Sequence, residues 1–243
     1  MKKGFWEKLR ALFAKRGYTC DSCGMEVFEY PQKRLCAECE TALKRNNEKR
    51  CPKCGRKTVS DGVCFDCKRI SPQFDKGFSP FDYKGVAASL VNRFKNGDRY
   101  LANFLAEEML KCLEEIPFQD LKSSIIVAFV PMTEEKQKER GYNQAEELAN
   151  VLAERLGISI EREALVKTRE TPKQKELSAK ERLGNLKGAY RVPKRTLVAG
   201  KYVLLIDDIM TTSSTGCECA RVLKNAGAEK VFFVTAVSVA ECK

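Results

Sequence analysis

Two adjacent carboxylates, Asp207 and Asp208, follow an apolar run at 203–206 and precede a turn that is rich in hydroxyl groups. The turn consists of Thr211, Thr212, Ser213, Ser214 and Thr215, and a helical pattern begins at its end. Carboxylates accept hydrogen bonds from sugar hydroxyls, and the free N–H groups at a helix N-terminus bind phosphate. The segment could therefore hold a sugar phosphate. The alternative is an ordinary strand end followed by a capped helix, because Ser and Thr are also favourable N-cap residues.

Eight of the 12 cysteines form four Cys-x2-Cys pairs, which predict two zinc sites. The first site would use Cys20, Cys23, Cys36 and Cys39, and the second would use Cys51, Cys54, Cys64 and Cys67. A Cys-x2-Cys turn directs two thiolates at one metal, and two such turns complete a tetrahedron. Because cysteine would fill all four positions, we expect structural Zn²⁺ sites with no position open for substrate. Interleaved pairing of the turns, or disulfides in place of metal, are the alternatives.

The chain has 243 residues and contains no histidine, which excludes catalysis by an imidazole base, as in Ser-His-Asp and Cys-His sites. The apolar fraction of 43% suffices for a core, but no window is long and apolar enough to span a bilayer. The opening Met1-Lys2-Lys3 is similar to the start of a secretory signal, yet charged residues interrupt the segment that follows. We therefore expect a cytoplasmic protein with reduced thiols.

The formal net charge is +11, and much of it lies in the first 70 residues. Two Zn(Cys)4 centres, each with a charge of −2, would remove part of this excess. The basic cluster at 44–57 consists of Lys44, Arg45, Lys49, Arg50, Lys53, Arg56 and Lys57. Such a cluster attracts nucleic-acid phosphates, and Phe28, Tyr30 and Phe65 could stack on bases. A solvated basic face, with the aromatic rings covering the zinc cores, is the alternative.

Apolar residues also recur at helical spacing near the beginning of the chain, namely Phe5, Trp6, Leu9, Leu12 and Phe13. They predict a short amphipathic helix over residues 5–13. Its apolar side could dock on a zinc ribbon or on the second domain. Weak contact with a membrane surface is the other interpretation, because the polar side is rich in lysine.

The sequence predicts two domains with a boundary near Ser71-Pro72: residues 1–70, which hold the cysteine pairs, and residues 71–243. In the second domain we expect helices at 85–96, 100–114 and 143–157, a strand at 124–130, a basic loop at 136–140 and a long polar loop or hood at 167–188. A strand at 202–208, a helix at 215–225 and a strand at 231–237 form a βαβ unit, which implies a parallel sheet. Ligands of such sheets bind beyond the carboxyl ends of the strands, where Pro131 and Asp207 would both lie.

The segment at 207–215 resembles the phosphoribosyl pyrophosphate loop of the type I phosphoribosyltransferases, and nearly the whole chain resembles the ComF family of competence-associated proteins. The motifs that carry the resemblance are Val130-Pro131, Arg140-Gly141-Tyr142-Asn143-Gln144, Thr168-Arg169-Glu170-Thr171 with Gln174, Arg182-x-x-Asn185-Leu186-x-Gly188-Ala189-Tyr190, the loop at 207–215 and the leading cysteine pairs. The chain departs from the usual pattern at Met132 and Thr133, which are often Leu-His, and at Ser213, which is usually Gly.

The resemblance implies an α/β, phosphoribosyltransferase-like domain with a parallel sheet, preceded by a double zinc ribbon. It implies that phosphoribosyl pyrophosphate binds with Mg²⁺, that Asp207 and Asp208 hold the ribose hydroxyls, and that residues 211–215 hold the 5-phosphate. The segment Val130, Pro131 and Met132 would cradle the pyrophosphate through N–H groups after Val130. Arg140 and Arg169 would close over it, which makes Asp207, Asp208 and Arg169 the catalytic set. A nucleophile would then displace pyrophosphate from C1 of the ribose.

The resemblance also implies a part in DNA uptake during natural competence. A non-catalytic adaptor for single-stranded DNA or for a competence helicase is the alternative, and the basic cluster at 44–57 favours it. Nucleobase salvage is a third hypothesis. The three predict, respectively, binding of phosphoribosyl pyrophosphate, salt-sensitive binding of single-stranded DNA, and pyrophosphate release with one specific base. No residue pattern indicates the acceptor or the oligomeric state.

Overall fold

The structure is a computed structural model that describes residues 19–29, 33–46, 49–59, 61–121, 124–170 and 186–241. The helix predicted at 5–13 and the residues Tyr30, Gln174 and Arg182 lie outside these ranges. Backbone contacts divide the chain into two compact units, Met1–Leu43 and Lys44–Lys243. The first four-cysteine group lies in the first unit, and the second group lies in the same unit as the sheet. The domain boundary near residue 70 stays a prediction.

The described part of the first unit is a small fold around its cysteines. An antiparallel bridge joins Thr19 to Glu26, and helix α2 (Ala37–Ala42) begins directly after Cys36. Its buried apolar residues are Cys20, Val27, Leu35, Cys39 and Leu43. So few apolar side chains bury little surface, and we therefore expect this unit to depend on a bound metal for its stability.

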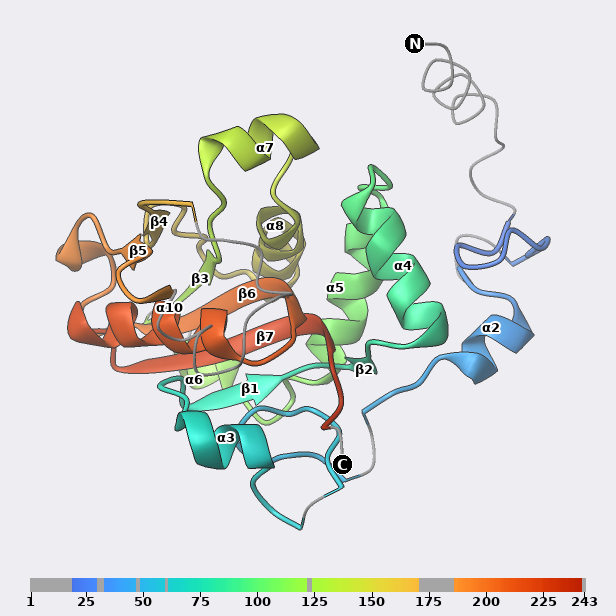
Figure 1. The fold of residues 1–243 in the computed structure, drawn as a ribbon. Helices are drawn as coiled ribbons and strands as arrows, with labels where there is room; N and C mark the ends of the chain where they lie inside the picture. The colour runs from blue at the N-terminus through green and yellow to red at the C-terminus, as the bar shows by residue number, and fades with distance from the viewer. Residues whose placement is uncertain are drawn as a thin grey trace. The chain divides into compact units, whose positions relative to one another are not determined.

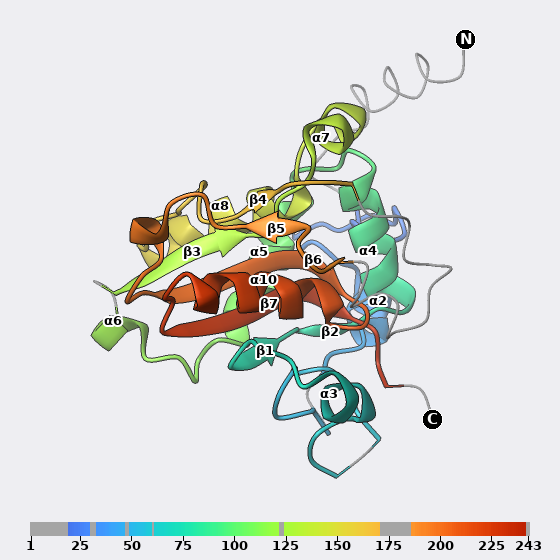
Figure 2. The same ribbon diagram turned by 60° about the vertical axis from the view of Figure 1, so that its left-hand side comes forward.

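The second unit is built on a parallel sheet with the order β1-β7-β6-β3, and β2 also pairs with β7. The strands are β1 (Lys76–Phe78), β2 (Phe81–Asp82), β3 (Ile125–Phe129), β6 (Tyr202–Met210) and β7 (Lys230–Ser238). Figures 1 and 2 show α10 (Ser214–Asn225) on one face of the sheet and α5 (Leu101–Lys111) with α8 (Gln144–Leu156) on the other. Because helices cover both faces, β3 is buried along its whole length.

Further elements complete this unit. They are α3 (Phe65–Ile70), α4 (Gly85–Lys95), α6 (Phe118–Leu121), α7 (Glu134–Arg140), the antiparallel pair β4 (Val166–Lys167) and β5 (Tyr190–Arg191), and the 3-10 helix η2 (Arg195–Leu197). Among the residues that the structure describes, no helix combines the length and the apolar character that crossing a bilayer requires.

The predicted βαβ unit is confirmed as β6, α10 and β7, with parallel strands. Strand β6 runs two residues further than expected, because Ile209 and Met210 keep their pairing with β7. The predicted helix at 143–157 is confirmed as α8, and the Asn143 side chain accepts a hydrogen bond from the Ala145 N–H (3.0 Å) as its N-cap. Its expected N3 partner, Glu146, forms an ion pair with Arg162 instead.

The prediction of a basic loop at 136–140 is wrong, since this segment belongs to helix α7. Its Glu, Lys, Gln and Arg residues are good helix formers, and the Thr133 hydroxyl accepts a bond from the Lys136 N–H at the helix N-terminus. The helix ends at Gly141, whose φ of 82° terminates it in the left-handed conformation. The lysines and arginine of this segment are therefore held on a short helix beside the end of β3.

Two glycines bring the second cysteine group against the edge of the sheet. Gly55, directly after Cys54, has a φ of +74°, and a Cβ there would lie 2.4 Å from the Gly77 carbonyl oxygen of β1. The Gly77 N–H donates to the Lys53 carbonyl oxygen (2.8 Å). The cysteine turn therefore lies backbone to backbone along the outer edge of β1, which only residues without a Cβ permit at these two positions.

Candidate functional site

The carboxyl ends of β3 and β6 meet at one edge of the sheet. The strands pair in parallel with Phe129 opposite Ile206, and the Val130 N–H donates to the Ile206 carbonyl oxygen (2.9 Å). A cavity of about 260 Å³ opens there. The predicted site residues that line it are Val130, Pro131, Met132, Arg140, Asp207, Asp208 and Thr215, together with Lys95, Lys136, Asn143, Gln144, Ala145, Lys167 and Tyr190. The two chain segments that the motifs singled out thus share one cavity.

The two carboxylates have different environments. Asp208 Oδ2 lies 3.1 Å from Lys95 Nζ of α4, and both residues of this ion pair line the cavity. Asp207 Oδ1 accepts a hydrogen bond from the Asp208 N–H (2.9 Å). Burial, followed by the nearby charge of Asp208, raises the pKa of Asp207 to about 8. The raised pKa favours the protonated form of Asp207 at neutral pH, and a ligand or cation that favours the carboxylate would displace this proton.

The hydroxyl-rich turn at 211–215 leads into α10, which begins at Ser214. Ser213 has a left-handed backbone, with φ of 61°, and its carbonyl oxygen accepts the Cys217 N–H (2.8 Å). Ser213 and Ser214 are buried, and of the five predicted residues Thr215 is the one that lines the 260 Å³ cavity. A hollow of about 10 Å³, which has room for about one water, lies inside the turn itself.

The two arginines that were predicted to close over the site lie at different places. Arg140, the last residue of α7, lines the 260 Å³ cavity, and its Nη1 donates to Gln144 Oε1 (3.1 Å). Arg169 lines an adjoining cavity of about 700 Å³, and its Nη2 donates to the Lys187 carbonyl oxygen (3.2 Å). Both cavities are lined by Pro131, Met132, Asn143 and Lys167. The larger one is bordered by both acidic and basic side chains, which suits a polar ligand next to the first.

The two four-cysteine groups are assembled as sequential pairing predicts. In each group the four sulfur atoms lie within 4.8 Å of one another, and the eight thiols are free, so neither interleaving nor disulfides hold. Cys23 and Cys36 have their sulfurs 3.7 Å apart, and Cys54 and Cys64 have theirs 3.8 Å apart. A tetrahedral ion with Zn–S bonds of about 2.3 Å places its sulfurs about 3.8 Å apart. The donor set and its spacing therefore fit Zn²⁺.

Comparison with known proteins supports both parts of the chain. A phosphoribosyl transferase domain matches residues 138–243, and a double zinc ribbon domain matches residues 8–68. The chain is 31% identical over 203 residues to the DNA utilization protein YhgH of Salmonella typhimurium, which covers 81% of this chain and 87% of the relative. It is 30% identical over 224 residues to competence protein F of Haemophilus influenzae, with coverages of 90% and 89%. It is also 30% identical over 210 residues to competence protein ComFC of Streptococcus pneumoniae, with coverages of 81% and 84%.

The chain belongs to the ComF family. The predicted fold class is confirmed with it: a phosphoribosyltransferase-like parallel sheet with two four-cysteine clusters of the double zinc ribbon.

Three residues of the cavity in this ComF-family protein were given no role from the sequence, namely Lys95, Lys167 and Tyr190. The Lys167 ammonium lies 5.8 Å from the centre of the Tyr190 ring. Burial, with the nearby charge of Lys136, lowers the pKa of Lys167. Lys167 directly precedes one ComF motif and Tyr190 ends another, which was the available signal. Lys95 had no signal, because the last turn of a helix is an ordinary place for lysine.

The basic cluster at 44–57 of the ComF-family protein is only partly open to a nucleic acid. Arg56 is 2% exposed, so its assignment to a nucleic-acid surface is wrong. Arg45 lies 3.5 Å from Glu108 and Lys49 lies 2.9 Å from Asp61 in ion pairs. The aromatic residues, unlike Arg56, are open to solvent: Phe28 is 85% exposed and Phe65 is 65% exposed. Neither ring covers a zinc core, and both are accessible for stacking.

Proposed function

We propose that this protein binds phosphoribosyl pyrophosphate with Mg²⁺ in the cavity between the ends of β3 and β6, and transfers its phosphoribosyl group. The observation that carries the proposal is the convergence of Asp207, Asp208 and the segment 130–132 on one cavity. The match of residues 138–243 to a phosphoribosyl transferase domain supports the same reading. The carboxylates suit the hydroxyls of a ribose, and the backbone beyond β3 suits a diphosphate.

The predicted site residues then have roles that follow from their chemistry. Asp207, once ionised, and Asp208 accept hydrogen bonds from the ribose hydroxyls, and the N–H groups at the start of α10 bind the 5-phosphate. Arg140 and the backbone after Val130 stabilise the charge that grows on the departing pyrophosphate. Two carboxyl groups in one cavity, one of which has a pKa raised by its burial and then by the charge of the other, also fit a divalent cation. Mg²⁺ would supply neutralisation of the pyrophosphate oxygens, with few ligands from the chain.

Transfer breaks the bond between C1 of the ribose and the pyrophosphate oxygen and forms a bond from C1 to an acceptor. We assign the adjoining 700 Å³ cavity to the acceptor, because it shares Pro131 and Met132 with the first cavity. Arg169 lies on this side. Release of pyrophosphate across a panel of nucleobases tests whether the acceptor is a base, as salvage requires. Release with none of them, under conditions where phosphoribosyl pyrophosphate binds, would remove the salvage hypothesis.

Isothermal titration of the protein with phosphoribosyl pyrophosphate and Mg²⁺ at pH 8 tests the proposed binding. The double variant Asp207→Asn/Asp208→Asn keeps the shape of both side chains but removes both charges, so we expect at least tenfold weaker binding. Asp120→Asn on α6 is the matched control, because Asp120 is exposed and outside the cavity. Absence of binding to the wild type, or equal affinity of the double variant, would refute the proposal.

Contact with single-stranded DNA is a second candidate function. It is supported by the exposed Phe28 ring and by the names of the relatives, which refer to DNA utilization and competence. Phe28→Ala should weaken the binding of a labelled oligonucleotide about tenfold, since one base–aromatic stack contributes about 1–3 kcal/mol. Met25→Ala is the matched control, because Met25 is 60% exposed in the same unit and has no ring. Fluorescence anisotropy at two salt concentrations measures both, and indifference to Phe28→Ala would exclude stacking at this position. The same two variants, Phe28→Ala and Met25→Ala, test the binding of a helicase partner of the kind that the resemblance to the ComF family implies.

A further inference from the structure

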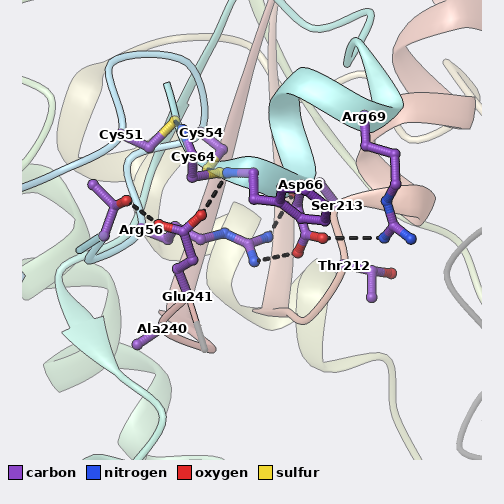
Figure 3. A network of polar contacts seen from close by, with 12 residues as sticks. Cys51, Cys54, Arg56, Cys64, Asp66, Arg69, Thr212, Ser213, Ala240 and Glu241 are labelled. Atoms are coloured by element: carbon purple, nitrogen blue, oxygen red, sulfur yellow. Dashed lines mark hydrogen bonds and ion pairs between the residues drawn. The ribbon is translucent and has the colours of Figure 1, made fainter. Parts of the chain in front are cut away.

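Arg56 is a buried cation that takes no part in the proposed chemistry of the cavity. Its carbonyl oxygen accepts the Cys51 N–H (3.0 Å), so its backbone closes the first cysteine turn of the second cluster. Its side chain runs from this cluster toward Asp66 and Ser213, as Figure 3 shows. Nη1 donates to Asp66 Oδ2 (2.9 Å), and Nη2 donates to Ser213 Oγ (2.9 Å). A guanidinium removed from water needs negative partners, and Asp66 and a Zn(Cys)4 centre supply them.

The contact between Arg56 and Asp66 joins the two halves of the second cluster. Arg56 follows the turn that carries Cys51 and Cys54, whereas Asp66 lies between Cys64 and Cys67 at the start of α3. An ion bound by all four sulfurs would hold these two halves together, and it would thereby hold Asp66 against Arg56. The first half is also seated on the sheet through the close contact of Gly55 with Gly77. The backbone of Arg56 is thus held by the cluster and the sheet, and its guanidinium reaches Ser213 in the loop at 211–215.

The residue that this guanidinium reaches is the conformationally restricted point of the loop. Ser213 has φ of 61° and ψ of 1°, a left-handed conformation that residues with a Cβ adopt at a cost. Ser213 is the N-cap of α10, yet its hydroxyl forms no cap bond and accepts from Arg56 instead. A strained conformation persists when its surroundings hold it in place. The bond from Arg56 is such a constraint, and it acts at the start of the helix whose N–H groups are proposed to bind the 5-phosphate.

We propose that Arg56 is a positioning residue for the loop at 211–215, and that the metal-bound second cluster holds this loop in its binding conformation through Arg56 and Ser213. Binding at the loop then depends on the second cluster and is independent of the first. The inference rests on the proposed function only for the identity of the ligand, because the contact between the cluster and the loop is independent of what the loop binds.

Amide hydrogen exchange of residues 211–217 in the zinc-loaded, full-length protein tests the inference without any ligand. Arg56→Met should retain two zinc ions per chain but exchange these amides about tenfold faster, because the loop loses a hydrogen bond to a charged group. Arg69→Met is the matched control. Arg69 Nη2 donates to Asp66 Oδ1 (3.1 Å), on the other side of the carboxylate that Arg56 uses, and Arg69 is not a partner of Ser213. Its loop should exchange at the wild-type rate, and so should the loop of Cys36→Ser, which disrupts the first cluster.

Variants of Ser213 keep the test decisive if Arg56→Met lowers the zinc content. Ser213→Ala keeps the strain and loses the bond, so its loop should exchange about tenfold faster than the wild type while both metals stay bound. Ser213→Gly loses the strain as well as the bond. The amide exchange rate of its loop should therefore lie between the rates of the wild type and Ser213→Ala. If Ser213→Gly instead protected the loop better than serine does, while Ser213→Ala was neutral, the bond from Arg56 would have no positioning role.

The ligand arm separates this inference from the proposed function. Titration with phosphoribosyl pyrophosphate and Mg²⁺ should show about tenfold weaker binding to Arg56→Met and Ser213→Ala, with Arg69→Met equal to the wild type. If the wild type binds no phosphoribosyl pyrophosphate, the proposed function fails, and the exchange rates still decide the inference. If the wild type binds it and the exchange rates of Arg56→Met and Ser213→Ala are unchanged with both metals present, the inference fails alone.

Discussion

Cys64→Ser is expected to lower the melting temperature of the second unit by about 10 °C or more, while Cys36→Ser leaves that transition within about 2 °C of the wild type. Loss of a structural metal removes several kcal/mol of binding free energy from the folded state. In a unit of this size about 4 kcal/mol corresponds to about 10 °C. The second cluster is buried at all four cysteines and shares a compact unit with the sheet, whereas the first cluster lies in the other unit.

The effect of Cys64→Ser should extend beyond the second cluster, because two further contacts join this cluster to the sheet of the same unit. The Glu241 carboxylate, beyond the end of β7, accepts bonds from the Thr58 hydroxyl and the Phe65 N–H. The Gly77 N–H of β1 donates to Lys53 between two metal ligands. Calorimetric melting with zinc measured by mass spectrometry checks the expectation, with two ions in the wild type and one in each variant. A Cys64→Ser protein that holds one zinc and melts like the wild type would show that these contacts do not couple cluster and sheet.

The affinity for phosphoribosyl pyrophosphate and Mg²⁺ is expected to rise about 50-fold between pH 6 and pH 8. The proposed binding mode needs the Asp207 carboxylate, and burial with the charge of Asp208 raises the pKa of Asp207 to about 8. The ionised fraction of such a group grows from about one hundredth at pH 6 to about one half at pH 8. Binding should therefore release a proton, which titrations in buffers of different ionisation enthalpy detect. Asp207→Asn should flatten the profile, and a profile unchanged in this variant would assign the dependence to another group, such as the ligand's own phosphates.

The stability of the ligand-free protein should change with pH in the opposite direction. A carboxyl in the unfolded chain titrates near pH 4, whereas Asp207 in the folded chain titrates near pH 8. Between these values the folded state binds more protons than the unfolded state, so the contribution of this group to the free energy of unfolding falls as the pH rises. Asp207→Asn should remove this dependence and stabilise the ligand-free protein at pH 8 by about 1 kcal/mol or more. Urea unfolding at pH 5 and pH 8 measures it.

The parts of this molecule that could be predicted are those specified by residues close together in the sequence. The Cys-x2-Cys turns direct two thiols at one point through their own backbone, so the clusters follow from local spacing. The segment from Tyr202 to Asn225 combines an apolar strand, a turn and an amphipathic helix, and it folds as expected. Helix α7 was missed because its charged residues leave no apolar stripe, although they favour a helix intrinsically.

The parts that could not be predicted depend on residues far apart in the chain. The ion pair between Lys95 and Asp208 and the bond from Arg56 to Ser213 join segments that only the folded sheet brings together. Arg56 was placed on a basic surface because neighbouring lysines and arginines surround it in the sequence. Its burial depends on its contacts with the second cluster and Asp66, and the composition of the surrounding sequence reveals neither contact. The left-handed conformation of Ser213 likewise becomes interpretable once its partner, Arg56, is known.

The turn that lies along the edge of β1 has a further consequence. A border strand with unsatisfied backbone groups is a template on which another chain can add, and proteins commonly cover such borders. Here the cover is a segment that folds around a metal, through the Gly77 N–H and the Lys53 carbonyl oxygen. Loss of the metal would therefore expose the outer edge of β1, in addition to its proposed effect on the loop at 211–215. We therefore expect the metal-free protein to self-associate more readily than the metal-bound protein.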